Sequence, residues 1–250
     1  MAMRHDEAFK FLFDLPAVCA DLLRVAAPGL WPQLDPLSVR NLRVGDSVAA
    51  DLTRRTGDAL CRVDLRGAKL PDGRAAYLLV PVEFQSGDDQ GMAERMGEYV
   101  SRQLDTLRRQ GSIPADDTPP VLPVVVYDGA ARWSAPDGLE PLRPLPPDAA
   151  AYLAAFQPPA YLLVDLVRAG LGDWPWDNRL RAVARLLRQD APERLAAVLA
   201  EELARFAGAA ELPFRQALYA WAGELWTKLS EGGTLLPFDS CEGCPLALPG

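Results

Sequence analysis

Residues 57–86 read GDALCRVDLRGAKLPDGRAAYLLVPVEFQS, and this stretch holds two apolar runs separated by the turn sequence Pro71-Asp72-Gly73. Apolar runs on either side of such a turn predict two adjacent strands of a hairpin. The second run has no polar residue between Tyr77 and Val82, which is typical of a strand covered on both faces. We therefore expect the sheet of this protein to be organised around these two strands.

Each predicted strand carries one acidic side chain in a setting that should be buried, Asp58 at the start of the first and Glu83 near the end of the second. A carboxylate in such a buried setting is costly unless another group pairs with it. A divalent cation shared by the two acids is one such partner, and ion pairs with nearby arginines are the other. The residues alone leave both interpretations open.

The pattern changes along the chain on both sides of this hairpin. Helical spacing of apolar residues predicts helices over Asp6–Ala27 and Met92–Arg109, and the apolar run Val121–Tyr127 predicts a further strand. Val44–Thr53 is a weak strand candidate. Three further helical patterns follow near the C-terminus, at Asn178–Gln189, Pro192–Ala207 and Pro213–Ser230. This order predicts an α/β core, with a mixed sheet flanked by helices, and a C-terminal helical extension.

Proline-rich sequence separates the two predicted parts. We place a first domain at residues 1–141, a Pro-rich connection at 142–177, the helical extension at 178–231 and a flexible tail at 232–250. The tail contains Cys241 and Cys244, which have half the spacing of a zinc knuckle without a second pair. An intermolecular metal site and an ordinary tail both remain open.

The composition excludes several classes of protein. The chain has 250 residues and is 49% hydrophobic, as is typical of a globular protein. It lacks an apolar run long enough to span a bilayer or to serve as a secretory signal. We therefore expect a cytoplasmic protein that does not bind a membrane. A net charge of −8 argues against a general nucleic-acid coat protein. The single histidine, His5, makes zinc hydrolases and Ser–His or Cys–His triads improbable.

Five short motifs occur in one order along residues 4–141. They are His5-Asp6-x-x-Phe9-Lys10, Gly57-Asp58-Ala59-Leu60, Glu83-Phe84-Gln85-Ser86, Met92-x-x-Arg95-Met96-x-x-Tyr99 and Leu122-Pro123-Val124-Val125-Val126-Tyr127-Asp128-Gly129-x-x-x-Trp133. In this register the chain resembles the Rpn family of recombination-promoting nucleases, also called YhgA-like transposases. That family is similar to the PD-(D/E)XK nuclease superfamily, which has a restriction-endonuclease-like core.

The resemblance implies a metal-dependent DNA endonuclease associated with recombination or mobile elements. Asp58 matches the first acid of the motif, Glu83 the second and Gln85 the position usually held by lysine. Asp58 and Glu83 would hold Mg²⁺, or Mn²⁺, together with the Phe84 carbonyl. Gln85 is a known variation that removes a charge, and Lys10 or Arg62 could supply that charge instead. We give Asp128 no role, because many relatives have asparagine there.

DNA is the expected partner, and phosphate contacts require Arg or Lys side chains that project from one surface. The candidates nearest the acids in sequence are Arg54, Arg55, Arg62, Arg95 and Arg102. Arg95, Arg102 and Arg109 recur at every seventh position of the predicted helix, so they form either a phosphate-contacting stripe or an ordinary solvated face.

Two alternatives stay open at this point. The chain could be a catalytically weak or inactive nuclease-like protein with a nucleic-acid-binding or regulatory role. The uncharged Gln85 and the acidic composition favour this alternative slightly. It could also hydrolyse phosphoesters in RNA or nucleotides. A homodimer is compatible with the sequence.

Overall fold

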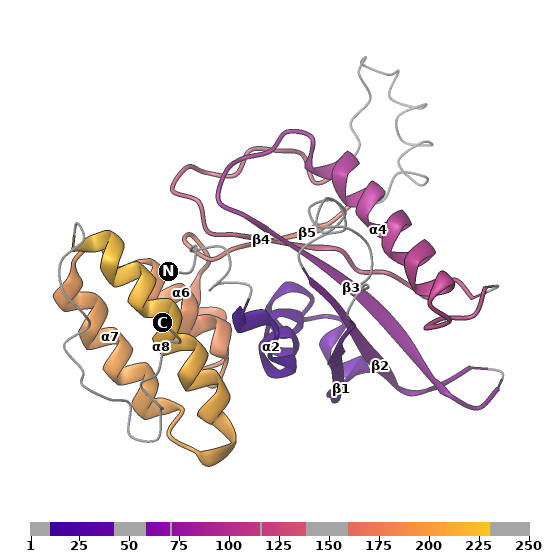
Figure 1. Ribbon diagram of the computed structural model, residues 1–250, viewed down its shortest axis with the longest axis horizontal. Helices are drawn as coiled ribbons and strands as arrows, with labels where there is room; N and C mark the ends of the chain where they lie inside the picture. Colours follow the sequence, from indigo (N-terminus) through magenta and orange to yellow (C-terminus); the bar gives the residue numbers. More distant parts are fainter. Residues whose placement is uncertain (1–10, 43–58, 71, 116, 139–159, 231–250) are drawn as a thin grey trace. The chain divides into compact units, whose positions relative to one another are not determined.

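The computed structural model describes residues 11–42, 59–70, 72–115, 117–138 and 160–230. These residues form a mixed sheet and a set of helices (Figure 1), so the predicted α/β class with C-terminal helices is confirmed. The strands are β1 (Leu34–Asn41), β2 (Ala59–Lys69), β3 (Ala75–Gln85), β4 (Val124–Tyr127) and β5 (Leu162–Asp165). The α-helices are α2 (Pro16–Ala26), α4 (Met92–Arg109), α6 (Arg179–Leu187), α7 (Pro192–Arg205) and α8 (Leu212–Leu229). Short 3₁₀-helices lie at Trp31–Gln33, Leu171–Asp173 and Ala209–Glu211.

The five strands lie in the order β1-β2-β3-β4-β5. β1, β2 and β3 are antiparallel neighbours, whereas β3, β4 and β5 run parallel. The predicted hairpin is therefore β2 and β3, and Gly73 in its turn has a φ of 83°, which glycine adopts at little cost. Parallel strands need a crossover connection, and α4 supplies it between β3 and β4.

β3 is the central strand, and its seven residues Tyr77–Glu83 are all buried. This burial on both faces explains why the run tolerates no polar residue before Glu83. Tyr77 and Leu79 pack with Leu107 of α4, so the odd-numbered side chains of β3 face that helix.

α4 has the bounds that the helical spacing predicts, Met92 to Arg109. Its first half packs Met92, Met96 and Tyr99 against Val125 of β4. Its second half packs Leu107 against the β2–β3 hairpin. The helix therefore covers one face of the sheet along its length (Figure 1), and burial of this apolar stripe holds it there.

Two strands were not expected from the sequence. β1 contains a proline and a 96% exposed leucine, Leu37, and its pairing with β2 shifts register between Asp35 and Arg40. A strand on the edge of a sheet tolerates such a proline and such a shift. β5 has four residues and lies inside the stretch 142–177 predicted as a connection. The strand candidate at 44–53 lies outside the described residues.

The chain divides into two compact units, Leu23–Asp165 and the combination of Met1–Leu22 with Leu166–Gly250. We call the first the sheet unit and the second the helical unit. The division falls within α2, which begins at Pro16, as expected for a proline in the first helical turn. The domain boundaries predicted from the sequence stay predictions.

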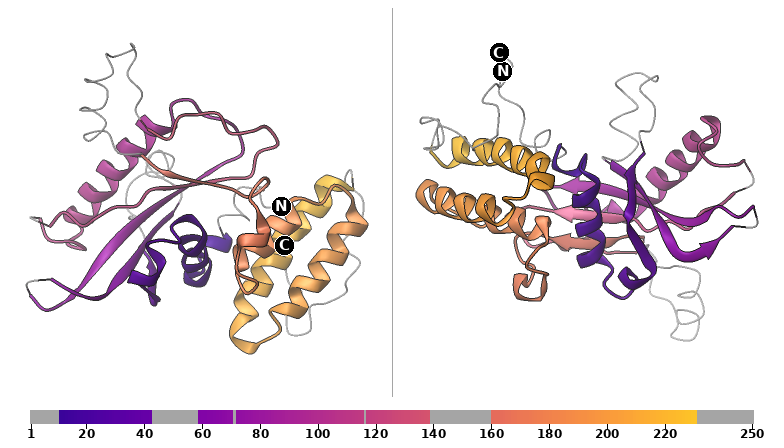
Figure 2. Two further views of the ribbon diagram at one scale, coloured as in Figure 1. Left: turned by 180° about the vertical axis from the view of Figure 1, so that it is seen from behind. Right: turned by 90° about the horizontal axis from the view of Figure 1, so that it is seen from below.

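In the helical unit, α6, α7 and α8 pack against one another (Figure 2). The side chain of Asn178 accepts the backbone N–H of Arg181 and so caps the start of α6. Asp21 is buried and ion-paired with Arg179, whose Nη1 lies 3.0 Å from its Oδ2. Burial raises the pKa of Asp21, and Arg179 opposes that shift.

Cys19 and Cys61 are both buried, whereas Cys241 and Cys244 lie outside the described residues. Within the described ranges, every helix is too short or too polar to cross a membrane.

Candidate functional site

The candidate site lies at the C-terminal end of β3. Glu83 and Gln85 are two residues apart on this strand, so their side chains project from the same face. Glu83 pairs in register with Val125 of β4, and Val125 packs against Met92 and Met96. The predicted acid and the predicted glutamine therefore lie on the face that α4 covers.

Glu83 is almost fully buried, with 6% of its surface exposed. Its Oε1 accepts a hydrogen bond from Gln85 Nε2 at 3.1 Å and another from Arg95 Nη2 at 3.3 Å. A buried carboxylate needs such partners, because its hydration is lost on folding. The interpretation of Glu83 as an ion-paired acid is thus realised in this structure, with Arg95 as the partner.

Arg95 contacts a second acid as well. Its Nη1 lies 2.6 Å from Oδ2 of Asp89, in the loop between β3 and α4. Asp89 also anchors the first turn of α4, since its Oδ1 accepts the Gly91 N–H at 2.9 Å and its carbonyl accepts the Met92 N–H at 3.0 Å. A carboxylate is favourable at the N-terminus of a helix because the free N–H groups carry partial positive charge. No local sequence pattern marks Asp89, because its partner Arg95 lies on α4.

The neighbouring Asp88 ties this loop to the segment that follows β4. Its carboxylate accepts the backbone N–H groups of Ser134 and Ala135, each at 3.0 Å, and also the Ser134 hydroxyl and the side-chain amide of Gln90. The Ser134 hydroxyl and then the backbone N–H groups lower the pKa of Asp88, because they stabilise its ionised form. The loop that carries Asp89 is therefore bonded both to the start of α4 and to the segment that follows β4.

The end of β4 approaches β3 closely. The backbone N–H of Asp128 donates to the carbonyl of Gln85 at 3.0 Å, and a Cβ on Gly129 would lie 2.4 Å from the carbonyl oxygen of Ser86 and 2.2 Å from the hydroxyl of Tyr127. Only glycine fits this position. Oδ1 of Asp128 is buried and has no hydrogen-bond partner among the described residues.

An aromatic cluster supports the loop beyond Gly129. The Trp133 ring lies edge-on to Tyr127, with centroids 5.0 Å apart, and its Nε1 donates to the hydroxyl of Tyr161 at 3.2 Å. Burial raises the pKa of Tyr161, whose hydroxyl in turn donates to the Pro136 carbonyl. These contacts fix the segment to which Asp88 is bonded.

Asp58, Arg54 and Arg55 lie outside the described residues, as do His5 and Lys10. Ala59, the residue after Asp58, begins β2 and pairs with Val82, directly before Glu83. That Asp58 and Glu83 share an ion stays a prediction.

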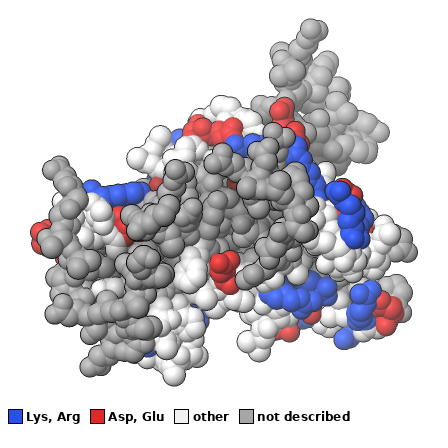
Figure 3. Space-filling view, viewed as in Figure 1, with Lys and Arg blue, Asp and Glu red and all other residues white. Residues whose placement is uncertain are grey.

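The predicted DNA-contacting arginines differ in their surroundings. Arg62 is largely buried, 3.6 Å from the ring centroid of Tyr77, and its Nε lies 3.4 Å from Asp64. Arg102 forms an ion pair with Glu98 at 2.8 Å, and Arg109 pairs with Asp105. Lys and Arg side chains gather along α4 with acidic side chains beside them (Figure 3). Of these arginines, Arg95 is brought to Glu83.

A divalent cation is compatible with the donors present, on the chemistry of their atoms. The carboxylate oxygens of Glu83 and the carbonyl oxygen of Phe84 are the kind of hard ligands that Mg²⁺ and Mn²⁺ prefer. Within the described residues, however, no three Asp, Glu, His or Cys side chains are grouped closely enough to hold a metal. A site built on Glu83 therefore needs another donor, and Asp58 is the candidate that the sequence offers.

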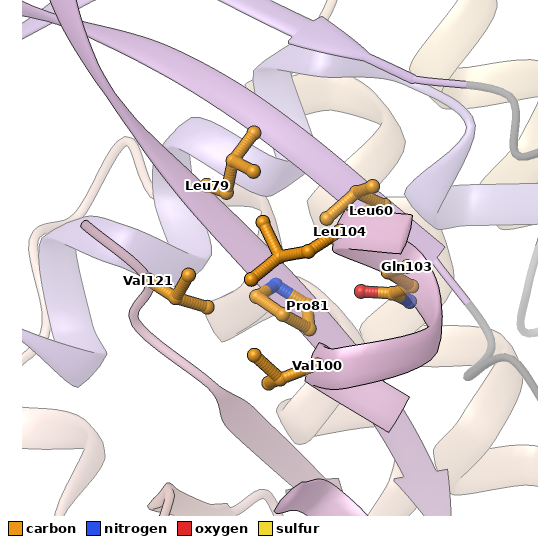
Figure 4. Close-up of a pocket in the computed structure, with 7 residues that line it drawn as sticks. All are labelled: Leu60, Leu79, Pro81, Val100, Gln103, Leu104 and Val121. Atoms are coloured by element: carbon orange, nitrogen blue, oxygen red, sulfur yellow. The ribbon is translucent and has the colours of Figure 1, made fainter. Parts of the chain in front are cut away.

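A crevice between α4 and the β2–β3 hairpin is not a substrate pocket. Its lining is almost wholly apolar (Figure 4), and it leaves no room for a water molecule. The lining residues are Leu60, Leu79, Pro81, Val100, Gln103, Leu104 and Val121. We interpret it as ordinary helix–sheet packing.

Comparisons with known proteins agree with the motifs. A sequence model of the family described as "Putative transposase, YhgA-like" matches residues 3–212. The recombination-promoting nuclease RpnC of Escherichia coli (strain K12) is 28% identical over 127 residues, which cover 51% of this chain and 39% of RpnC. The match thus spans well under two thirds of that relative. No solved structure matches the chain.

Proposed function

The chain belongs to the YhgA-like transposase family, and from this premise we propose that it is a metal-dependent nuclease that hydrolyses DNA phosphodiester bonds in recombination or in the movement of mobile elements. The name of RpnC, a recombination-promoting nuclease, supports the nuclease class. The observation that carries the proposal is the buried Glu83 carboxylate at the end of β3, with the Gln85 amide directed at it.

Asp58 and Glu83 would hold Mg²⁺ or Mn²⁺, with the Phe84 carbonyl as a further ligand. When bound, the ion lowers the pKa of a bound water and polarises the phosphoryl oxygen. Gln85 cannot take up a proton at neutral pH, so its amide acts only by hydrogen bonding, and it orients the attacking water or the phosphate. The restraint of the loop by Asp88 keeps the neighbouring groups in place, which lowers the entropic cost of reaction.

The second candidate is a protein that retains the nuclease core and binds nucleic acid without turnover. The ion pair between Arg95 and Glu83 favours it, because a guanidinium already neutralises the acid that should bind the ion. Gln85 in the lysine position points in the same direction.

Plasmid cleavage distinguishes the two candidates. We expect nicking or linearisation with Mg²⁺ or Mn²⁺, none with Ca²⁺ or with EDTA, and loss of activity in Glu83→Gln. Glu193→Gln, at an exposed position in the first turn of α7, is the matched control and should retain full activity. Retained DNA binding without cleavage under every condition would support the inactive candidate, and cleavage of an RNA substrate alone would reassign the substrate. The cytoplasmic location and a homodimer stay predictions.

A further inference from the structure

Among the described residues, the positive charge that contacts Glu83 is Arg95, which comes from α4 rather than from β3. Gln85 donates a neutral hydrogen bond to the same oxygen, Oε1, that Arg95 contacts. A divalent cation that binds Glu83 must share this carboxylate with the guanidinium or displace it. Two positive groups on one carboxylate repel each other.

Asp89 offers a solution to this competition. Arg95 reaches Glu83 with Nη2 and Asp89 with Nη1, so the two contacts use different nitrogens. The Asp89 contact is the shorter of the two, at 2.6 Å against 3.3 Å. Breaking the contact with Glu83 therefore leaves the guanidinium bonded to Asp89.

We propose that Asp89 is a positioning residue, which holds Arg95 beside the site when a divalent cation takes Glu83. This inference rests on the proposed metal-dependent function. Asp89 itself is fixed by the Gly91 N–H, and its loop by the bonds of Asp88 to Ser134 and Ala135. A guanidinium held in this way keeps a positive charge next to the end of β3, where Gln85 supplies none, and it can bind a phosphate oxygen there.

The role of Arg95 as a competitor and the role of Asp89 as a positioning residue predict opposite effects on cation binding. Removing the guanidinium in Arg95→Gln removes the competitor for Glu83, so cation affinity should rise, on the order of tenfold. In Asp89→Asn, Glu83 is the acid that Arg95 keeps among the described residues, and cation affinity should fall, on the order of threefold. Asparagine keeps an oxygen that accepts the Gly91 N–H, so the start of α4 is preserved.

Calorimetric titration with Mn²⁺ of the full chain and its variants tests this inference. In the double variant Asp89→Asn/Arg95→Gln, the affinity should lie within about twofold of Arg95→Gln alone, because Asp89 acts only through Arg95. Asp72→Asn and Arg74→Gln are matched controls, since Arg74 Nε lies 2.6 Å from Asp72 at the opposite end of β3. Both controls should leave Mn²⁺ affinity unchanged.

Three outcomes overturn the inference. Unchanged affinity in Arg95→Gln, with measurable binding by the unaltered protein, would show that the guanidinium does not compete, and the metal site would stand. If Asp89→Asn lowers Mn²⁺ affinity equally in the unaltered protein and in Arg95→Gln, Asp89 is a direct ligand of the cation. No binding by the unaltered protein or by Arg95→Gln would remove the metal site, and with it the proposed function. Binding in Arg95→Gln alone would support the inference in its strongest form.

Discussion

The guanidinium of Arg95 joins Glu83 at the end of β3 to Asp89 at the start of α4, with Nη2 on the first acid and Nη1 on the second. The two acids lie on either side of the turn between the strand and the helix. This bridge fixes the first turn of α4 over the strand end at which the two predicted site residues, Glu83 and Gln85, lie.

Gln85→Ala should lower the rate of DNA cleavage by about a hundredfold, the typical effect of removing one hydrogen-bond donor from a reacting centre. Gln85→Lys should raise the rate by about tenfold, because a charged donor stabilises the transition state more strongly than an amide does. Single-turnover kinetics measure both rates. Thermal midpoints should stay within about 3 °C of the unaltered protein, since the amide makes one net hydrogen bond worth about 1 kcal/mol. An unaffected rate in Gln85→Ala would exclude Gln85 from the site.

Gly129→Ala should destabilise the protein by about 2 kcal/mol or more, because the added Cβ would overlap the Ser86 carbonyl and the Tyr127 ring. Gly97→Ala, within α4, is the matched control, since a Cβ there meets no atom within 4 Å. It should stabilise by up to about 1 kcal/mol through helix propensity. Denaturant unfolding measures both. Equal effects of the two substitutions would contradict the close approach at the end of β4.

Asp88→Asn should lower the thermal midpoint at neutral pH, and the difference should shrink as pH falls. A carboxyl whose pKa is lowered on folding stabilises the protein above its unfolded-state pKa, and that contribution is lost as pH falls through the lowered value. The ordinary pKa is 3.8, so the difference should diminish below about pH 4. Midpoints measured from pH 7 to pH 3 test this prediction. Ser134→Ala should reproduce part of the effect, because the Ser134 hydroxyl is the largest cause of the shift.

Replacing Arg95 and Arg102 together by Gln should weaken DNA binding and flatten its dependence on salt. If each arginine contacts one phosphate, the slope of log affinity against log salt should fall in magnitude by about two. Fluorescence anisotropy in Ca²⁺ at several salt concentrations measures this slope, and Arg74→Gln is the control. An unaltered slope would show that neither arginine contacts a phosphate, with Arg95 held by Glu83 and Asp89 and Arg102 by Glu98. Attention would then move to Arg54 and Arg55.

Arg179→Ala should destabilise the helical unit by about 3 kcal/mol, because it leaves the buried Asp21 carboxylate without its cation. The backbone N–H at position 179 still lowers the pKa of Asp21, but without the guanidinium burial should raise that pKa further. The loss of stability should therefore be smaller at pH 4 than at pH 7, since burying a protonated carboxyl costs less free energy than burying a carboxylate. Asp21→Asn/Arg179→Met, which removes both charges, should recover part of the stability. If stability is not recovered, loss of the ion pair is not the cause of the destabilisation in Arg179→Ala.

Much of the fold could be predicted from local sequence. The bounds of α4 followed from apolar spacing alone, as did the hairpin of β2 and β3 from two apolar runs and a turn. β1 and β5 could not be predicted, because one contains a proline and the other has only four residues. Such edge strands are defined by their partners in the sheet rather than by their own periodicity.

The sequence by itself determined which residues belong to β3 and that Glu83 and Gln85 share a face of it, because strand alternation is a property of neighbouring residues. It also identified the family through short motifs in order. Only the tertiary structure decided which of the described arginines reaches Glu83. That choice depends on how α4 is rotated over the sheet, and packing of Met92, Met96 and Leu107 sets this rotation. Asp89 and Asp88 became visible for the same reason, since their partners lie on other elements and no local pattern records contacts between them.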